Sequence, residues 1–133
     1  MTRLIDASVV IKWMVTEVGS EHAMKLYGAD LAAPDLMLIE LANILWKKAR
    51  QGEIVPVQAA LGLAEAQAMI NIMPMSGLEA RALEIALELA HPVYDCVYLA
   101  LAEALDTVMV TADTRLLKAC AGTAMARYAE PLA

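Results

Sequence analysis

Residues 107–111 read Thr-Val-Met-Val-Thr, and an acid, Asp113, follows two positions later. The apolar, β-branched middle of this stretch is typical of a parallel strand that is buried on both faces of a sheet. A shorter run near the start of the chain, Arg3-Leu4-Ile5, also has the pattern of a strand and stops at an acid, Asp6. We therefore expect a central strand over residues 107–111 and a second strand over residues 3–5.

The residues between these strands alternate helical patterns with short apolar runs, which favours an α/β fold. The clearest helix covers residues 36–51, is followed by Gly52 in the place of a C-cap glycine, and carries one apolar face, at Leu38, Leu41, Ile44 and Leu45. Further helices are expected over residues 9–15 (with Ser8 as N-cap), 21–29, 57–70, 77–90, 93–105 and 116–121. Minor strands are expected over residues 31–33, 71–75 and 124–128, the last at an edge. The sequence thus predicts a three-layer α/β/α sandwich with a short, mostly parallel central sheet.

The composition is strongly apolar for a chain of 133 residues, which by length is one domain over residues 1–133. Hydrophobic residues make up 60% of the chain, yet no run approaches the roughly 20 apolar residues of a membrane span. The surplus predicts a large core or a partner interface. Cys96 and Cys120 match no zinc spacing, and no secretory signal pattern opens the chain, so we expect a cytoplasmic protein with buried, reduced thiols.

The charge of the chain restrains its choice of partners. The formal net charge is -6, whereas nucleic-acid binding usually shows as a basic field. An acidic total can still contain a local basic patch, or acids that are grouped to hold a cation.

Four acids stand in unusual places. Asp6 and Asp113 follow strands, and ligands of open α/β sheets bind beyond the carboxyl ends of the strands. Glu40 and Asp95 have apolar neighbours on both sides, where a buried carboxylate is unfavourable unless it is paired or bound to metal. Asp95 also falls in the first turn of its predicted helix, where the helix dipole favours an anion.

If the four carboxylates converge, a divalent cation is the natural partner. Two like charges about 4 Å apart repel by roughly 4 kcal/mol at an effective dielectric constant near 20, and a cation removes this conflict. Carboxylate and hydroxyl ligands select Mg²⁺ or Mn²⁺ over softer metals. The only histidines, His22 and His91, leave little room for imidazole-rich metal sites or for Ser-His-Asp chemistry. A hard cation held by carboxylates suits phosphoryl chemistry, in which it activates water and polarises the phosphate.

Each acid also has a purely structural interpretation. Asp6 fits a turn at the end of a strand, Asp113 an N-cap, and Asp95 a partner of its helix dipole. Glu40 fits an exposed position on an amphipathic helix, or an ion pair with Lys47 or Lys48.

Four motifs in order give the chain a resemblance to a known family. They are Leu4-Ile5-Asp6-Ala7-Ser8, Leu38-Ile39-Glu40-Leu41, Tyr94-Asp95-Cys96-Val97-Tyr98-Leu99-Ala100 and Val110-Thr111-Ala112-Asp113-Thr114-Arg115-Leu116. Over essentially its whole length the chain resembles PIN-domain proteins, in particular the VapC-type toxins of bacterial type II toxin–antitoxin pairs. The resemblance implies a metal-dependent endoribonuclease that acts on transfer RNA or another structured RNA.

The same resemblance implies roles for particular residues and partners. Asp6, Glu40, Asp95 and Asp113 would bind one or two Mg²⁺ or Mn²⁺ ions, with Ser8 and Thr111 in support. It further implies a homodimer, and a cognate antitoxin whose helical tail lies in an apolar groove. RNA would rely on a few cations, among which we select Lys12, Lys47 and Arg115.

A second hypothesis is a catalytically idle α/β protein-binding module of the same fold. A receiver-like domain would place paired acids near the first strand and a lysine after the last, and this chain has neither. A phosphatase with an aspartate nucleophile fits poorly too, because Ser8 stands where its second acid is expected. RNA cleavage in the presence of metal discriminates between the module and the nuclease.

Overall fold

A five-stranded sheet forms the centre of the computed structural model, which describes residues 1–133. The strand order is β3-β2-β1-β4-β5, and every neighbouring pair is parallel. The strands are β1 (Arg3–Ile5), β2 (Leu31–Pro34), β3 (Asn71–Met73), β4 (Met109–Thr111) and β5 (Ala129–Pro131). Ile5 of β1 is in register with Val110 of β4, so the chain leaves these two strands at the same edge.

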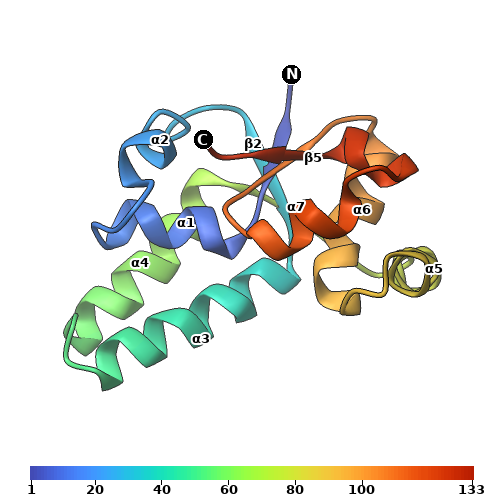
Figure 1. Ribbon diagram of the computed structural model, residues 1–133. Coiled ribbons are helices and arrows are strands. Elements are labelled where there is room, and N and C mark those ends of the chain that lie inside the picture. The colour runs from blue at the N-terminus through green and yellow to red at the C-terminus, as the bar shows by residue number, and fades with distance from the viewer.

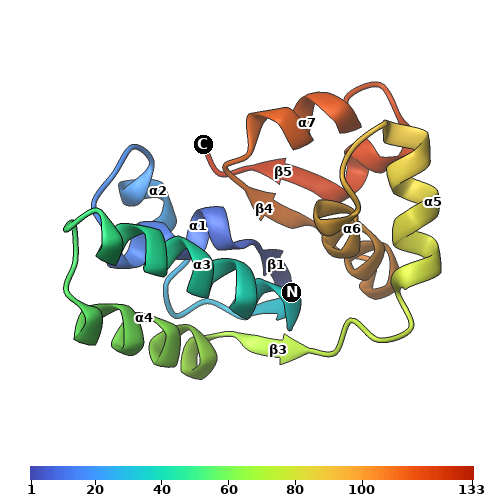
Figure 2. The same ribbon diagram turned by 90° about the horizontal axis from the view of Figure 1, so that it is seen from below.

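Helices flank this sheet on both sides, which confirms the predicted three-layer α/β/α sandwich. Figures 1 and 2 show the first four helices to one side of the strands and the last three to the other. The helices are α1 (Ala7–Met14), α2 (Ser20–Met24), α3 (Leu36–Arg50), α4 (Pro56–Met69), α5 (Glu79–Leu89), α6 (Val93–Leu105) and α7 (Thr114–Cys120), with a 3-10 helix η1 (Ala124–Tyr128). No helix is by itself long and apolar enough to cross a membrane; α5 and α6 would be so only as a pair, and they are bent by 115°.

The core lies where these layers meet the sheet. All residues of β2 and β4 are buried, and so is every residue of α6 from Cys96 to Ala102, because α6 contacts β1, β2 and β4. Both thiols, Cys96 and Cys120, are buried and free, as expected. The amphipathic helices bury one face each: Met37, Leu41 and Leu45 in α3, and Ala82, Ile85 and Leu89 in α5.

The structure corrects the start of the first helix. We expected Ser8 as the N-cap of a helix beginning at residue 9, whereas α1 begins at Ala7 and its N-cap is Asp6. Asp6 accepts the hydrogen bond from the amide of Val9. The Ser8 hydroxyl donates to Asp6 and accepts from the amide of Ala112 across the sheet. The Ser8 hydroxyl, which we expected to cap the helix, is therefore engaged in a long-range hydrogen bond with Ala112 instead.

The minor elements also differ from expectation. Residues 124–128 form the 3-10 helix η1, not a strand, because Thr123 caps them by accepting from the amide of Met125; the edge strand is β5, directly after. β2 is an interior strand between β1 and β3, although it was expected to be minor. α2 ends at Met24, five residues early. By contrast α6 has the predicted bounds, and Gly52 follows α3 with a positive φ of 77°, as a C-cap glycine does.

The core predicts a sharp contrast between two leucines. Leu41 of α3 is fully buried, and Leu87 of α5 is 75% exposed. We expect Leu41→Ala to lower the free energy of unfolding by about 2–5 kcal/mol through lost burial and a residual cavity. Leu87→Ala, the matched control, should change it by less than about 0.5 kcal/mol. Urea denaturation checks both, and equal losses would contradict the packing described.

Candidate active site

The edge of the sheet at which β1 and β4 end is the natural place for a ligand. β1 leads through α1 and α2 to β2 on one side, and β4 leads through α7 to β5 on the other. Where neighbouring parallel strands send their connections in opposite directions, a crevice opens beyond their carboxyl ends. Asp6 follows β1 directly, and Asp113 lies two residues past β4.

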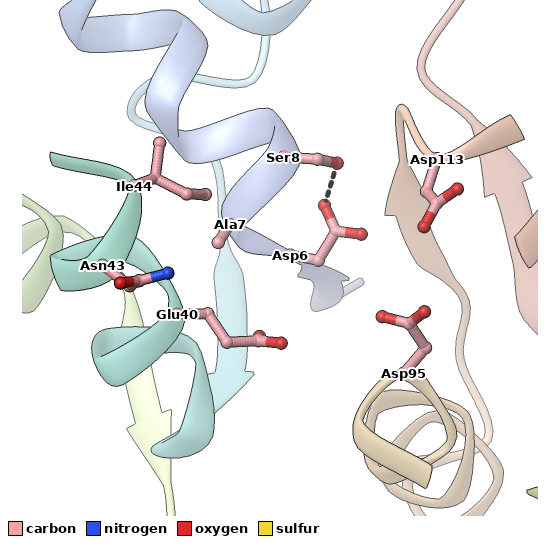
Figure 3. A pocket seen from close by; sticks show the side chains of 8 residues that line it. All are labelled: Asp6, Ala7, Ser8, Glu40, Asn43, Ile44, Asp95 and Asp113. Carbon is pink, nitrogen blue, oxygen red and sulfur yellow. Dashed lines mark hydrogen bonds between the residues drawn. The ribbon is translucent and has the colours of Figure 1, made fainter. Parts of the chain in front are cut away.

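Two helices bring the remaining acids to this crevice. α3 starts just after β2, so Glu40 in its second turn lies near the same edge; α6 leads back toward β4, so its first turn, with Asp95, lies there as well. Asp6, Glu40, Asp95 and Asp113 line one cavity of about 290 Å³ together with Ala7, Ser8, Asn43 and Ile44. Figure 3 shows the four carboxylates turned toward this space from four separate elements. We call it the acidic pocket.

Asp6 is the most enclosed of the four acids, with 6% of its surface exposed. One carboxylate oxygen, Oδ1, accepts from the Ser8 hydroxyl and the amide of Val9, and Oδ2 accepts from the Thr111 hydroxyl. The Thr111 oxygen in turn accepts from the amide of Asp113 at 3.0 Å. Ser8 and Thr111, which we predicted to support the site, thus orient Asp6 and join β1 to the loop after β4.

Burial perturbs the acidity of two of these groups. It raises the pKa of Asp6 to about 6, against the hydrogen bonds from Ser8 and Thr111, which lower it. Burial also raises the pKa of Glu40 to about 7; the Tyr98 hydroxyl lowers it, and the charges of Asp95 and Asp6 raise it further. Glu40 therefore stays partly protonated near pH 7, where an isolated carboxyl is ionised, chiefly because it is buried.

The two other acids have partners of their own. The Nε2 atom of His91 lies 2.6 Å from Oδ2 of Asp95, with the His91 side chain largely enclosed. Asp113 caps α7 by accepting from the amides of Arg115 and Leu116. The structural interpretation of Asp113 as an N-cap is therefore correct, and the same side chain also lines the pocket.

Three residues of the site were missed by the sequence analysis. The Tyr98 hydroxyl donates to Oε1 of Glu40 at 2.6 Å. Glu40 forms no ion pair with Lys47 or Lys48, and Lys48 pairs with Glu17 and Glu53 instead. Asn43 lines the pocket one turn of α3 after Glu40. His91 precedes Asp95 by four residues, one helical turn, and this spacing is the only local signal for their contact. The contact of Tyr98 with Glu40 spans 58 residues and has no local signal.

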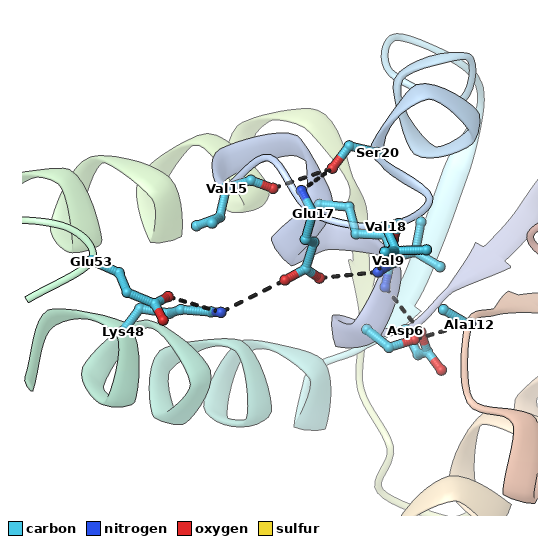
Figure 4. A network of polar contacts seen from close by, with 11 residues as sticks. Asp6, Val9, Val15, Glu17, Val18, Ser20, Lys48, Glu53 and Ala112 are labelled. Carbon is cyan, nitrogen blue, oxygen red and sulfur yellow. Dashed lines mark hydrogen bonds and ion pairs between the residues drawn. The ribbon is translucent and has the colours of Figure 1, made fainter. Parts of the chain in front are cut away.

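The three cationic side chains predicted to bind RNA differ in whether they already contact other groups of the protein. The Lys12 ammonium lies 3.0 Å from Glu17 and donates to the carbonyl of Val18. Glu17 also pairs with Lys48, which reaches Glu53, in the network of Figure 4. Lys47 and Arg115 are exposed and form no ion pair.

The donor set of the pocket fits a hard divalent cation. All four acids offer carboxylate oxygens as ligands, and none of the residues that line the pocket is a cysteine or a histidine. No three of the chain's acidic, histidine or cysteine side chains lie close enough together to coordinate one ion directly. A cation in this pocket would therefore have at most two of these side chains as direct ligands, with water in its remaining positions.

An apolar groove runs between α3 and α4, apart from the acidic pocket. Its volume is about 340 Å³, and Trp46 on its wall is half exposed. The groove is lined by Ala42, Leu45, Trp46, Ala49, Pro56, Ala59, Ala60 and Leu63. Part of the apolar surplus in the composition therefore lies at the surface.

Comparisons with known proteins agree on one family. The model of the PIN domain matches residues 3–122. Ribonuclease VapC3 of Pyrobaculum aerophilum is 34% identical over 121 residues, which cover 87% of this chain and 92% of that protein. The crystal structure of PAE2754 from the same organism superposes with a TM-score of 0.74 at 27% identity, over 99% of this chain and 92% of that one. DNA-bound VapBC from Salmonella typhimurium has a TM-score of 0.71 with full coverage of both chains, and its 18% identity supports the fold alone.

The raised pKa of Glu40 predicts a pH-dependent stability in the absence of metal. The folded protein keeps a proton on Glu40 up to about pH 7, above the ordinary value of 4.5. Because the folded state binds this proton more tightly than the unfolded state, Glu40 contributes its full share to the free energy of unfolding below pH 4.5. This contribution is lost as the pH rises from 4.5 through about 7. Glu40→Gln should remove the loss, so that with a chelator the variant is more stable than the parent at pH 8 by on the order of 1 kcal/mol.

Urea unfolding between pH 4 and pH 8 in EDTA measures this difference. Glu65→Gln makes the same exchange at an exposed position and serves as control. Parallel pH profiles for the parent and Glu40→Gln would show that Glu40 does not carry a raised pKa.

Proposed function

Since this chain belongs to the PIN-domain family, we propose that it is a ribonuclease that hydrolyses phosphodiester bonds of RNA in the acidic pocket. The observation that carries the proposal is the meeting of Asp6, Glu40, Asp95 and Asp113 in one cavity. The relative at 34% identity, which is named a ribonuclease, supports the same activity. Internal cleavage, with transfer RNA or another structured RNA as substrate, is the finer part of the proposal.

The proposed cofactor is Mg²⁺ or Mn²⁺ in the acidic pocket, with one or two of the four carboxylates as direct ligands of an ion and the others reaching it through water. When bound, the ion polarises the phosphate and lowers the pKa of a coordinated water. The chain's own contribution is to fix the ligands. Asp6 is held by Ser8, Val9 and Thr111, and Asp95 is held by His91.

RNA contacts are proposed for the free cations near the pocket. Asn43 and Lys47 follow Glu40 at spacings of three and seven residues, which places all three on one face of α3. Arg115 lies in the first turn of α7, two residues after Asp113. Lys12 stays a predicted contact, although its ammonium is occupied by Glu17 and Val18.

We further propose that the protein is the toxin of a type II toxin–antitoxin pair and works in the cytoplasm as a homodimer. Several solved structures of similar fold are VapBC complexes, such as that of Salmonella typhimurium. The apolar lining of the groove between α3 and α4 supports the proposal that it receives a helical tail of a cognate antitoxin. We also extend the single PIN-like domain to residues 1–133, beyond the matched range of 3–122.

An RNA cleavage assay tests the central claim. With Mg²⁺ or Mn²⁺ the protein should cut RNA, and EDTA should abolish the activity. Asp6→Asn and Asp95→Asn should each lower the rate by at least about 100-fold, because a metal site that loses a carboxylate loses both charge and geometry.

The control is Asp106→Asn, an exposed acid in the left-handed conformation, which asparagine tolerates. This variant should cleave like the parent. Activity that survives EDTA or either pocket variant would overturn the carboxylate–metal mechanism. A pure, folded protein that cleaves no RNA but binds an antitoxin would favour the idle module.

A second experiment tests the proposed RNA contacts. Lys47→Ala and Arg115→Ala should each raise KM for RNA several-fold with little change in kcat, and should make KM less sensitive to salt, because each removes about one phosphate contact. Lys25→Ala, an exposed lysine of α2's C-cap, is the control. If all three variants behave alike, or if kcat falls in place of a rise in KM, Lys47 and Arg115 do not contact the substrate.

A further inference from the structure

Helix α6 reaches two of the four acids of the pocket. Asp95 lies in its first turn, and Tyr98 follows three residues later. The hydroxyl of Tyr98 donates to Oε1 of Glu40, which belongs to α3, at 2.6 Å. α3 and α6 lie to different sides of the strands (Figure 2), so this bond joins the two sides beyond the edge of the sheet.

The position of the Tyr98 hydroxyl is fixed by the core. Tyr98 is 0% exposed and is the largest of the fully buried side chains. A ring packed at the density of a protein interior has no alternative rotamer that leaves its neighbours in place. Its hydroxyl is therefore a rigid donor to Glu40, which lines the pocket.

Glu40, in contrast, depends on this single contact. Asp6 accepts three hydrogen bonds and Asp113 accepts two, whereas the Glu40 carboxylate has only the Tyr98 hydroxyl as partner. A glutamate has more rotatable bonds than an aspartate and loses more freedom when it is fixed. Figure 3 shows the Glu40 carboxylate turned into the pocket. Its Oε2 atom accepts no hydrogen bond from the protein, since the bond from Tyr98 goes to Oε1.

We propose that Tyr98 is a positioning residue that fixes the Glu40 carboxylate and thereby strengthens the binding of a divalent cation in the acidic pocket. The inference rests on the proposed function, since it concerns the cation of that same site. Partners that orient a metal ligand typically contribute about 10- to 100-fold to metal affinity or activity. Tyr98 acts through Glu40 and is not expected to touch RNA.

The decisive variant is Tyr98→Phe, which removes one oxygen and keeps the ring. Its matched control is Tyr27→Phe, because the Tyr27 hydroxyl donates to Glu65 at the same length, 2.6 Å, away from the pocket. Titration with Mn²⁺ alone, followed by electron paramagnetic resonance of the free ion, gives the affinity without RNA. We expect the Kd for Mn²⁺ to rise about 10-fold in Tyr98→Phe and to stay within about 2-fold in Tyr27→Phe.

A double-mutant cycle separates positioning from a general effect on the fold. If Tyr98 acts through Glu40, Tyr98→Phe should not weaken Mn²⁺ binding further in a Glu40→Gln background. In RNA cleavage, Tyr98→Phe should lower kcat with KM nearly unchanged, and a higher Mn²⁺ concentration should restore part of the loss. Rescue by the ion is not expected from mere loosening of the core.

Glu40→Asp provides a second route if Tyr98→Phe does not fold. The shorter side chain keeps its charge but cannot reach the Tyr98 hydroxyl, so it should weaken Mn²⁺ binding about as much. Unchanged Mn²⁺ affinity in the variant that folds, or an equal loss in the Glu40→Gln background, would overturn the role of Tyr98. If the parent binds Mn²⁺ as expected but cuts no RNA, the proposed function fails while the positioning role still stands or falls on the Mn²⁺ titration.

Discussion

Asp6 is the point at which the elements of this fold are joined. It ends the first strand, caps the first helix through the amide of Val9, and accepts from the hydroxyl of Thr111, which lies at the end of the neighbouring strand. Burial of a carboxylate is unfavourable unless donors surround it, so strand, helix and loop must all be in place for this one side chain to be tolerated. Asp113 is tied to this junction through the hydrogen bond from its amide to Thr111, and the raised pKa of Asp6 follows from the same burial.

A feature of this structure could be predicted from the sequence when the residues that determine it lie close together along the chain. β1, α3 and α6 were predicted nearly residue by residue, because their apolar periodicity and end signals are local. The placement of Asp6 and Asp113 was predictable because a parallel sheet gathers the carboxyl ends of its strands at one edge. The hydroxyl of Ser8 was assigned to the wrong amide, since its true partner, Ala112, lies 104 residues away. Tyr98 was missed for the same reason: it is apolar by pattern, and its hydroxyl meets Glu40 58 positions earlier in the chain.

The net charge of -6 and the apolar composition acquire a structural meaning. Four of the acids are gathered in one pocket, where a cation would neutralise part of the charge. Glu17 engages both Lys12 and Lys48, so these lysines serve the fold and add little to an electrostatic field around the molecule. Any attraction for a polyanion must therefore come from a few isolated cationic side chains and from the proposed metal ion. The apolar excess is divided between the core and the groove beside Trp46, which offers a large surface for burial to a partner.

The contact between Thr111 and Asp6 spans 105 residues of the chain. During synthesis β1 leaves the ribosome long before β4. Until β4 has been made, β1 lacks this neighbouring strand and the carboxylate of Asp6 lacks the hydrogen bond from the Thr111 hydroxyl. A nascent chain of a hundred residues can form its early helices, yet it lacks Asp113 and the wall that encloses the pocket. The proposed site is thus complete only after Asp113 has been translated.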